Sequence, residues 1–389
     1  MRALCAAAAA AAALAACGPS AKPVKPEQDP AVVSKQQARD SLTDAREAAK
    51  NGDIEAADKD YAQAYSLNKS FDVLAERVMF LIHAGRAQRA IDLAKAFYDD
   101  DANMTDIKGY NLYAEALLAR ERANDALGVA DKAIDLNAQS PWGHEKKGRA
   151  LVLLERVDEG VVELRSAVKL DGNNPELHMS LAAGLVKAGK LDEGQGEFRL
   201  AIRLAPDSAE AQIGLANALR TMKRDDDAKA ALDKAIQLDP RSGRAYFELG
   251  LLYNGESKQA DAEQSLSKAV QLSPNESLFW YAYGEIFRLS QRTDDAIHAY
   301  KKAVELDPPY AKAITKLATI LIDKKQYDEA INVLVVGKAA PDYLLLGKVY
   351  KIQKRKKEAT EAYEKYLELA PKDDPDRGAA REALAELKR

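Results

Sequence analysis

Cysteine is nearly absent from this 389-residue chain, in which the only two are Cys5 and Cys17. Because both lie close to the start, the chain beyond Cys17 has neither a disulfide framework nor a catalytic thiol. Aromatic residues make up only 6%, and there are four histidines. The sequence contains no phosphate-binding glycine loop, nucleophile elbow, His-Glu-x-x-His motif or EF-hand spacing. It therefore predicts no enzymatic activity, no metal and no cofactor.

The sequence also lacks an excess of positive charge and a long apolar run. Its formal net charge is −4, which argues against a nucleic-acid partner, because such partners favour a clear basic excess. The apolar stretch Ala3–Ala16 has 14 residues, fewer than the roughly 20 needed to span a bilayer. It follows Arg2 and predicts the core of a secretory signal peptide over residues 1–16.

What the sequence does contain is an internal repeat with a period of about 34 residues. Two successive copies occupy Gly243–Tyr310, in which Tyr246 matches Trp280 and Gly250 matches Gly284. Small residues recur at this step in two columns along the chain. The first column is Ala114, Gly148, Ala182, Ala216, Gly250, Gly284 and Ala318, and the second is Ala126, Gly160, Gly194, Ala228, Ala262, Ala296 and Ala330.

Each repeat has two sets of apolar residues at helical spacing, separated by a polar break. This pattern predicts a pair of helices that cross closely at the small residues, and Pro274 or Pro308 ends the second helix. One pair cannot bury both of its apolar faces, so the pairs must stack. The arrangement resembles the tetratricopeptide repeat (TPR). The resemblance implies an all-α, right-handed superhelical solenoid of about ten helix-turn-helix repeats with a C-terminal capping helix.

The repeats divide the chain into four parts. Residues 17–37, which contain Pro19, Pro23, Pro26 and Pro30, are predicted to be an extended Pro-rich tether, with a spacer of no set length as the alternative. The solenoid is expected over residues 38–372, and its first two repeats are degenerate. One repeat near 311–339 is shortened, because the step from Ala318 to Gly347 falls about five residues short of a full repeat. Residues 373–389 form the predicted capping helix.

The segment around Cys17 carries a second resemblance. Residues 14–18, LAACG, resemble a bacterial lipobox. The resemblance implies cleavage before Cys17 and acylation of its thiol and its new amino group, and an ordinary signal peptide is the alternative. Gly18 is not the aspartate that retains such lipoproteins at the inner membrane. The implied location is therefore the outer membrane, with the chain facing the periplasm.

In TPR proteins the first helices line the concave face and bind extended partner segments. Counting one helical turn on from the packing positions predicts a set of polar and aromatic residues on that face. The set is Asn217, Arg220, Arg244, Phe247, Asn254, Tyr281, Glu285, Arg288, Lys312 and Lys316. Arginine and asparagine suit a peptide backbone or carboxylate, and Phe247 and Tyr281 are the predicted apolar anchors.

Two more patterns have a functional and a structural interpretation. His144 and His178 are one repeat length apart and suit either a metal pair or packing between repeats, and we favour packing. Acidic runs such as Asp225–Asp227 suit solvated helix starts better than calcium sites. The two-carboxylate clamp and the asparagine ladder known from other TPR proteins are both missing, since Lys146, Ser180 and Glu248 occupy ladder positions.

Together these features predict a non-enzymatic protein–protein interaction scaffold that is lipid-anchored in the bacterial envelope. By resemblance it would assist assembly of an envelope machine such as a pilus secretin or a polysaccharide-export system. The alternatives are an accessory regulator of an envelope enzyme, such as a glycosyltransferase or peptidoglycan enzyme, and a direct polysaccharide binder. The expected partners are a protein and the membrane, with no nucleic acid and no small-molecule substrate.

Overall fold

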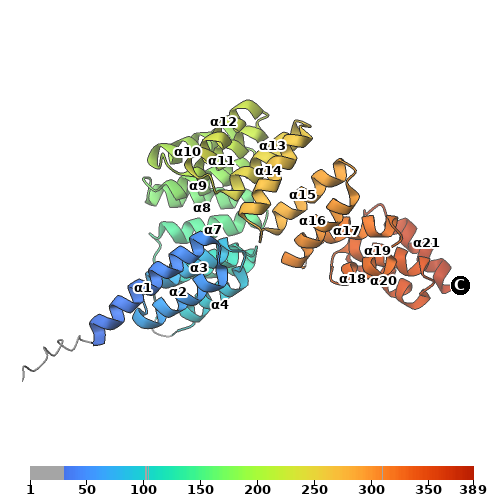
Figure 1. Ribbon diagram of the computed structural model, residues 1–389, viewed down its shortest axis with the longest axis horizontal. Coiled ribbons are helices and arrows are strands. Elements are labelled where there is room, and N and C mark those ends of the chain that lie inside the picture. The colour runs from blue at the N-terminus through green and yellow to red at the C-terminus, as the bar shows by residue number, and fades with distance from the viewer. Residues whose placement is uncertain (1–29, 101–102, 104, 309) are drawn as a thin grey trace, which may run out of the picture. The chain divides into compact units, whose positions relative to one another are not determined.

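The computed structural model describes residues 30–100, 103, 105–308 and 310–389. The predicted signal peptide, Cys17 and residues 18–29 of the predicted tether lie outside the described residues. Over the described ranges the chain forms 21 α-helices and no β-strand (Figure 1). Among the helices described, none combines the length and the apolar character that crossing a membrane requires. The all-helical fold predicted from the repeat is confirmed.

The described helices form nine hairpins, two further helices and a final single helix. In chain order α1 Pro30–Asn51 pairs with α2 Ile54–Asn68, and the two helices α3 Phe71–His83 and α4 Ala87–Tyr98 follow. The remaining hairpins are α5 Ile107–Leu118 with α6 Ala123–Leu136, α7 Pro141–Leu153 with α8 Val157–Leu170, α9 Pro175–Lys187 with α10 Leu191–Leu204, α11 Ala209–Thr221 with α12 Asp225–Leu238, α13 Gly243–Gly255 with α14 Gln259–Leu272, α15 Ser277–Leu289 with α16 Thr293–Leu306, α17 Ala311–Asp323 with α18 Tyr327–Leu334, and α19 Ala340–Ile352 with α20 Lys356–Leu369. The last helix is α21 Arg377–Lys388.

The end of the predicted tether is helical. Helix α1 begins at Pro30, so residues 30–37 are its first two turns and the prediction of extended chain there is wrong. Proline is well accepted at the first position of a helix, because its missing N–H would have no partner there. The next proline along the chain is Pro141, and the residues that follow Pro30 include good helix formers. The prediction of an extended tether was therefore carried too far, past Pro30, the last proline of the group.

The described residues divide into two compact units, one within residues 30–81 and the other within residues 82–389. In the first unit, Ala45, Ala57 and Tyr61 form a core on which Phe80 packs. Asp58 and Arg77 are buried beside it, with Arg77 Nε 2.6 Å from Asp58 Oδ1. This pairing satisfies two charges that would otherwise be costly to bury.

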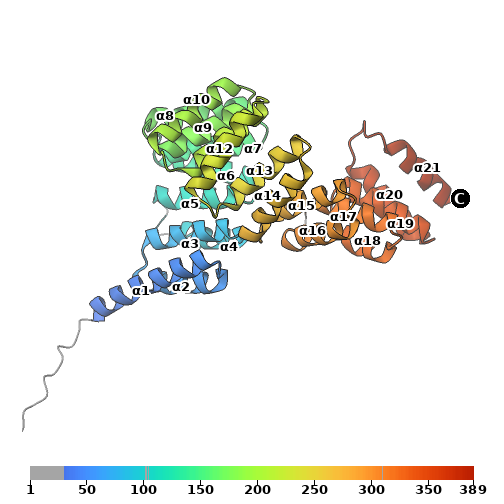
Figure 2. The ribbon, with the colours of Figure 1, turned by 45° about the horizontal axis from the view of Figure 1, so that its top comes forward.

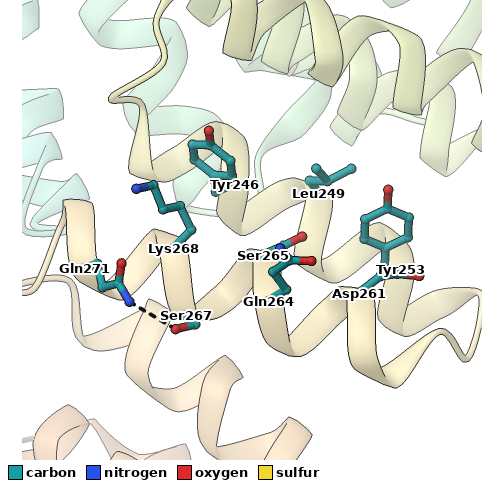
Figure 3. A pocket seen from close by; sticks show the side chains of 9 residues that line it. All are labelled: Tyr246, Leu249, Tyr253, Asp261, Gln264, Ser265, Ser267, Lys268 and Gln271. Atoms are coloured by element: carbon teal, nitrogen blue, oxygen red, sulfur yellow. Dashed lines mark hydrogen bonds between the residues drawn. The ribbon is translucent and has the colours of Figure 1, made fainter.

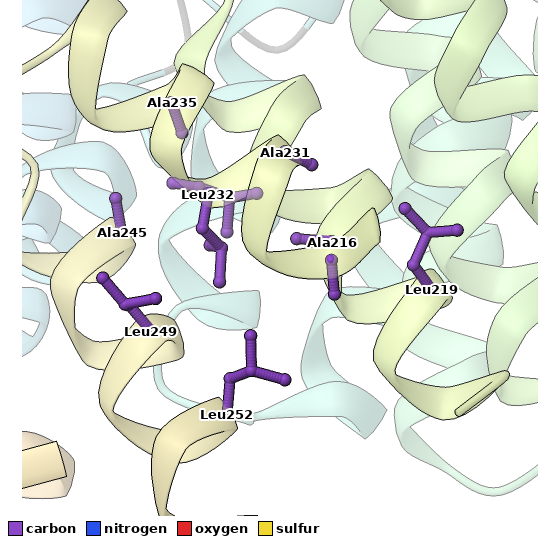
Figure 4. Packing of buried hydrophobic residues seen from close by; sticks show 10 residues of the cluster. Ala216, Leu219, Ala231, Leu232, Ala235, Ala245, Leu249 and Leu252 are labelled. Carbon is purple, nitrogen blue, oxygen red and sulfur yellow. The ribbon is translucent and has the colours of Figure 1, made fainter. Parts of the chain in front are cut away.

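In the second unit each first helix packs against its own second helix and against the second helix of the preceding hairpin (Figure 2). One such layer is formed by Ile213, Ala216, Leu219, Leu232 and Leu252, together with Ala228, Ala231, Ala235, Ala245 and Leu249 (Figure 4). These residues come from α11, α12 and α13, so the core runs on from hairpin to hairpin. A stack of this kind is stabilised by contacts between neighbouring hairpins.

The small-residue columns mark the places where the two helices of a hairpin cross. A Cβ placed on Gly148 would lie 2.9 Å from the backbone oxygen of Gly160 and 2.6 Å from Leu164 Cγ. A Cβ on Gly160 would in turn lie 2.8 Å from the backbone oxygen of Gly148. Helices α7 and α8 therefore approach more closely than any larger residue at either position allows.

This contact leads to a stability prediction for Gly148→Ala. Alanine is the better helix former by about 1 kcal/mol, yet the variant should lose roughly 1–3 kcal/mol of unfolding free energy because its methyl group meets backbone. The matched control is Gly196→Ala in α10, where an added Cβ would have nothing within 4 Å. The control should gain about 0.5–1 kcal/mol. Urea unfolding followed by circular dichroism measures both, and a stabilised Gly148→Ala protein would contradict this account of the crossing.

The repeat between Ala318 and Gly347 is shorter than the others because its second helix, α18, is short. Helix α18 has 8 residues, whereas α16 has 14. Beyond α18, the buried carboxylate of Asp342 accepts hydrogen bonds from Thr315 Oγ1 and from the backbone N–H of Ala339, each at 3.0 Å. A Cβ on Gly337 would lie 2.3 Å from Asp342 Oδ2, so glycine at this position makes room for the carboxylate.

Helix α21 covers the last hairpin. Ala380 is buried among Leu344, Tyr363 and Tyr366. Arg377 donates hydrogen bonds to the backbone oxygens of Leu367 and Ala370, at 2.8 and 2.7 Å. These oxygens lie at the end of α20, where helical carbonyls have no partner within the helix. The capping role predicted for the C-terminal segment is confirmed.

Candidate functional site

First helices of successive hairpins contact one another from α5 to α15, and α17 contacts α19 in the same way. We call this series of first helices the inner row. It carries all ten residues of the predicted partner surface, so their placement on first helices is as expected. Their surroundings, however, differ from one part of the inner row to another.

At α5, α7 and α9 the inner row holds a buried charge network that the sequence analysis did not identify. Glu145 and Lys146 are only 1% and 7% exposed. Lys146 Nζ lies 2.6 Å from Glu115 Oε2 and 2.7 Å from Glu145 Oε2. Arg149 donates to both oxygens of Glu115, at 2.7 and 3.2 Å, and Ser180 Oγ donates to Glu145 Oε1 at 2.8 Å. Two acids and two bases from two hairpins thus balance one another, and Ser180 of a third hairpin adds a hydrogen bond.

Burial and charge act in opposite directions on this network. Burial alone would raise the pKa of Glu115, but the charges and hydrogen bonds of Lys146 and Arg149 outweigh burial and lower that pKa from 4.5 to about 2. For Glu145 the balance has the same sign, because Lys146 and Arg149 again outweigh burial and lower its pKa. The pKa of Lys146 is raised, because the two carboxylates overcome the desolvation that would lower it. All of these groups are therefore held in their charged forms.

A smaller polar group joins α11 to α13. Asn217 Nδ2 donates to Glu248 Oε1 at 3.1 Å, and Arg220 Nη2 lies 3.9 Å from Glu248 Oε2. Glu248 is buried, whereas the Arg220 side chain is 41% exposed. Asn217 is therefore engaged within the fold, and of the two predicted residues only Arg220 presents a large exposed part.

Helix α13 carries one residue that the sequence analysis placed wrongly. Phe247 is 5% exposed and stacks on Phe279, with ring centroids 4.5 Å apart and an interplanar angle of 18°. It is a core residue between two hairpins, so the prediction of an exposed apolar anchor is wrong. Arg244 is exposed and donates to Glu210 at 3.2 Å. Asn254 is half-buried in the last turn of α13.

A third group of interacting polar and aromatic residues lies on α15, α16 and α17. Glu285 accepts hydrogen bonds from Arg288 Nη2 at 2.8 Å and from the Tyr300 hydroxyl. Burial would raise the pKa of Glu285, but these bonds and the charges of Arg288 and Lys316 lower it. The half-buried ring of Tyr281 lies 5.3 Å from the ring of Tyr310 and 5.8 Å from that of Tyr300.

The structure thus brings Tyr281, Glu285, Arg288 and Lys316 together as one cluster, which we call the α15–α17 cluster. Lys312 is exposed in the first turn of α17. The Arg288 side chain is 40% exposed, so a positively charged edge remains accessible beside the tyrosine rings. Two bases, Arg288 and Lys316, act on Glu285 here, and the charge of Asp307 acts on the neighbouring Tyr310.

The two histidines have structural partners. His144 Nδ1 lies 2.6 Å from Glu163 Oε2, and its Nε2 lies 3.2 Å from the backbone oxygen of Ala138. His178 repeats the arrangement with Glu197 at 2.6 Å and Gly172 at 3.0 Å. Both nitrogens of each ring therefore face oxygen atoms of the protein. No cluster of His, Cys, Asp and Glu side chains suited to a metal ion occurs in the part of the chain that the structure describes.

Comparison with family models places tetratricopeptide repeats in one continuous part of the chain. One model matches residues 185–252 and 287–346, a second matches 260–311, and a third matches 243–276 and 343–373. All three are described as tetratricopeptide repeats, and proteins built from them generally mediate protein–protein interactions. A comparison with curated proteins gave no match.

Solved structures show the same fold at low sequence identity. Yeast Tom70 is 16% identical with a TM-score of 0.54, over 91% of this chain and 89% of that one. The Cut9–Hcn1 hetero-tetramer of the APC/C is 16% identical with a TM-score of 0.50, over 90% of this chain and 76% of that one. The human IFIT1 dimer with PPP-AAAA is 17% identical with a TM-score of 0.50, over 87% of this chain and 95% of that one. Tetratricopeptide repeats are therefore recognised over residues 185–373, within a chain whose fold is that of a helix-turn-helix solenoid.

Proposed function

We propose that this protein is a non-enzymatic scaffold that binds an extended, acidic segment of a partner protein along the inner row. The α15–α17 cluster is the observation that supports this most directly. Arg288 and Lys316 accompany Glu285, Lys312 is exposed in the first turn of α17, and the tyrosine rings of the cluster provide apolar contact. Arginine pairs with carboxylates through two parallel hydrogen bonds, which suits an acidic partner.

We further propose that a lipid on Cys17 holds the scaffold at the bacterial outer membrane, facing the periplasm. Support comes from the lipobox resemblance of residues 14–18 and from the apolar stretch that precedes it. Two or three acyl chains give stable anchoring where one chain is marginal. In this position the scaffold would assist assembly of an envelope machine, such as a pilus secretin or a polysaccharide-export system.

A photocrosslinking amino acid in place of Tyr281 tests the binding surface in cells. We expect it to capture a discrete protein partner, and Arg288→Glu in the same background should reduce that capture at least tenfold. Gln237, exposed on the second helix α12, is the matched position for the control crosslinker. Capture at Gln237 alone, or capture at Tyr281 that is unaffected by Arg288→Glu, would refute binding at the α15–α17 cluster.

The lipid anchor is tested separately in the same cells by Cys17→Ser. The wild-type protein should remain with the outer membrane, and the Cys17→Ser variant should move to the soluble fraction. Retention of Cys17→Ser in the membrane, with residues ahead of Cys17 intact in the wild-type protein, would disprove the anchor. The crosslinking result would still stand.

A further inference from the structure

A groove of about 510 Å³ lies between α13 and α14, and none of the residues that line it belongs to the predicted partner surface (Figure 3). Its α13 side is formed by Tyr246, Leu249 and Tyr253, which follow one another along the helix. Its α14 side is polar and includes Gln264, Lys268 and Gln271. The volume is within the range of roughly 300–1,000 Å³ that is usual for small-molecule sites.

Comparison between repeats shows how this hairpin differs from two earlier ones. In the hairpins α7–α8 and α9–α10 the corresponding space holds the pairs His144–Glu163 and His178–Glu197. At the matching positions of α13 and α14 the chain has Tyr246 and Ser265. Serine in place of glutamate removes the side chain that reaches back to the first helix.

The wall chemistry favours a neutral ligand rich in hydroxyl groups. Asp261 and Lys268 carry opposite charges, and the remaining polar residues of the groove are uncharged amides and hydroxyls. Gln271 Nε2 donates to Ser267 Oγ at 3.3 Å, which orders two of these groups. An anionic ligand would require surplus positive charge, and an apolar helix would require apolar walls on both sides. Neither is present in this groove.

The distance between the two tyrosines of the groove indicates the length of the ligand. Tyr246 and Tyr253 lie two helical turns apart on one helix, a rise of about 10.5 Å at roughly 1.5 Å per residue. This is about the length of two linked hexose rings. The apolar face of a sugar ring packs well on an aromatic ring, while amides and hydroxyls can bond its hydroxyl groups. We propose that this groove, formed by α13 and α14, binds a neutral oligosaccharide.

Titration of the purified full-length chain with cellohexaose and with chitohexaose tests the proposal. Trp280 packs against the same core cluster as Tyr246 and Tyr253, so its fluorescence is followed alongside calorimetry. We expect saturable binding of at least one of these probes. Replacing Gln264, which lies on the α14 side of the groove, by tryptophan should fill the groove and weaken binding at least tenfold.

The control is Glu361→Trp, an exposed residue on the second helix of the last hairpin, which should leave binding unchanged. Tyr253→Ala, checked for folding by circular dichroism, should also bind at least tenfold more weakly. Absence of saturation by both probes at millimolar concentration, or equal affinity in Gln264→Trp and wild type, would overturn the proposal. Since none of these residues belongs to the α15–α17 cluster, failure here leaves the proposed partner surface untouched.

Discussion

Replacing Lys146 with methionine should lower the free energy of unfolding by about 3–5 kcal/mol. Lys146 is 7% exposed and lies within 2.7 Å of both Glu115 and Glu145. Without its ammonium group, two carboxylates share the one remaining base, Arg149, and Glu145 stays buried with its charge incompletely balanced. Removal of one partner from a buried pair is costly mainly because of the charge that remains.

Two comparison variants separate this effect from a general loss of lysine. Lys147→Met removes the neighbouring lysine, whose side chain is 27% exposed and contacts Asp131 and Glu163, and should cost less than about 1 kcal/mol. The double variant Glu145→Gln with Lys146→Met keeps the pair of Glu115 and Arg149 and should recover much of the loss. Urea unfolding followed by circular dichroism measures all three. Equal destabilisation by Lys146→Met and Lys147→Met would show that the buried network contributes little.

The same network should make the protein sensitive to acid. The pKa of Glu115 is about 2 in the folded protein and 4.5 in the unfolded chain, so the folded state binds the proton more weakly than the unfolded state. The contribution of this carboxylate is therefore fully present above about pH 4.5 and is lost as the pH falls toward 2. A shift of this size corresponds to roughly 3 kcal/mol at most.

Glu115→Gln isolates this contribution. The variant should be less stable than the wild type at pH 6, and the difference should shrink as the pH falls from about 5 toward 2. Urea midpoints measured at several pH values test the expectation, with Glu159→Gln as a control at an exposed carboxylate paired with Arg156. A difference between Glu115→Gln and wild type that is constant over this range would mean that Glu115 does not titrate as the geometry implies.

The fold could be predicted because its constraints repeat. Gly148 and Gly160 must be small for a local reason, the close crossing of two adjacent helices, and that reason recurs once in every repeat. Helix existence, hairpin pairing and the deficit before Gly347 all follow from such columns. The start of α1 did not follow, because the tether was assigned from proline density rather than from the helix-forming residues after Pro30.

The candidate site could be predicted only in part, because contact between hairpins decides which side chains remain accessible. Phe247 has the helical phase of a surface residue, yet Phe279 of the next hairpin covers it. Asn217 is engaged in a similar way by Glu248. One signal was nevertheless in the sequence: Glu115 and Arg149 are opposite charges separated by one repeat length, which places them side by side on adjacent first helices. Opposite charges at this separation predict a pair between adjacent first helices, which is part-buried at Glu115 and Arg149 and exposed at Glu210 and Arg244.

The shortened helix α18 has a consequence for how such a protein evolves. Its main contacts are with α17 and α19, and it also touches α16 of the preceding hairpin through Ala330 and through the pair of Lys301 with Glu329. A deletion here is consequently absorbed by the hairpin and its two neighbours, and selection on distant hairpins is not disturbed. A lineage can thus lengthen, trim or duplicate individual modules while the others keep their inherited specificities, so that new recognition properties arise without redesign of the whole molecule.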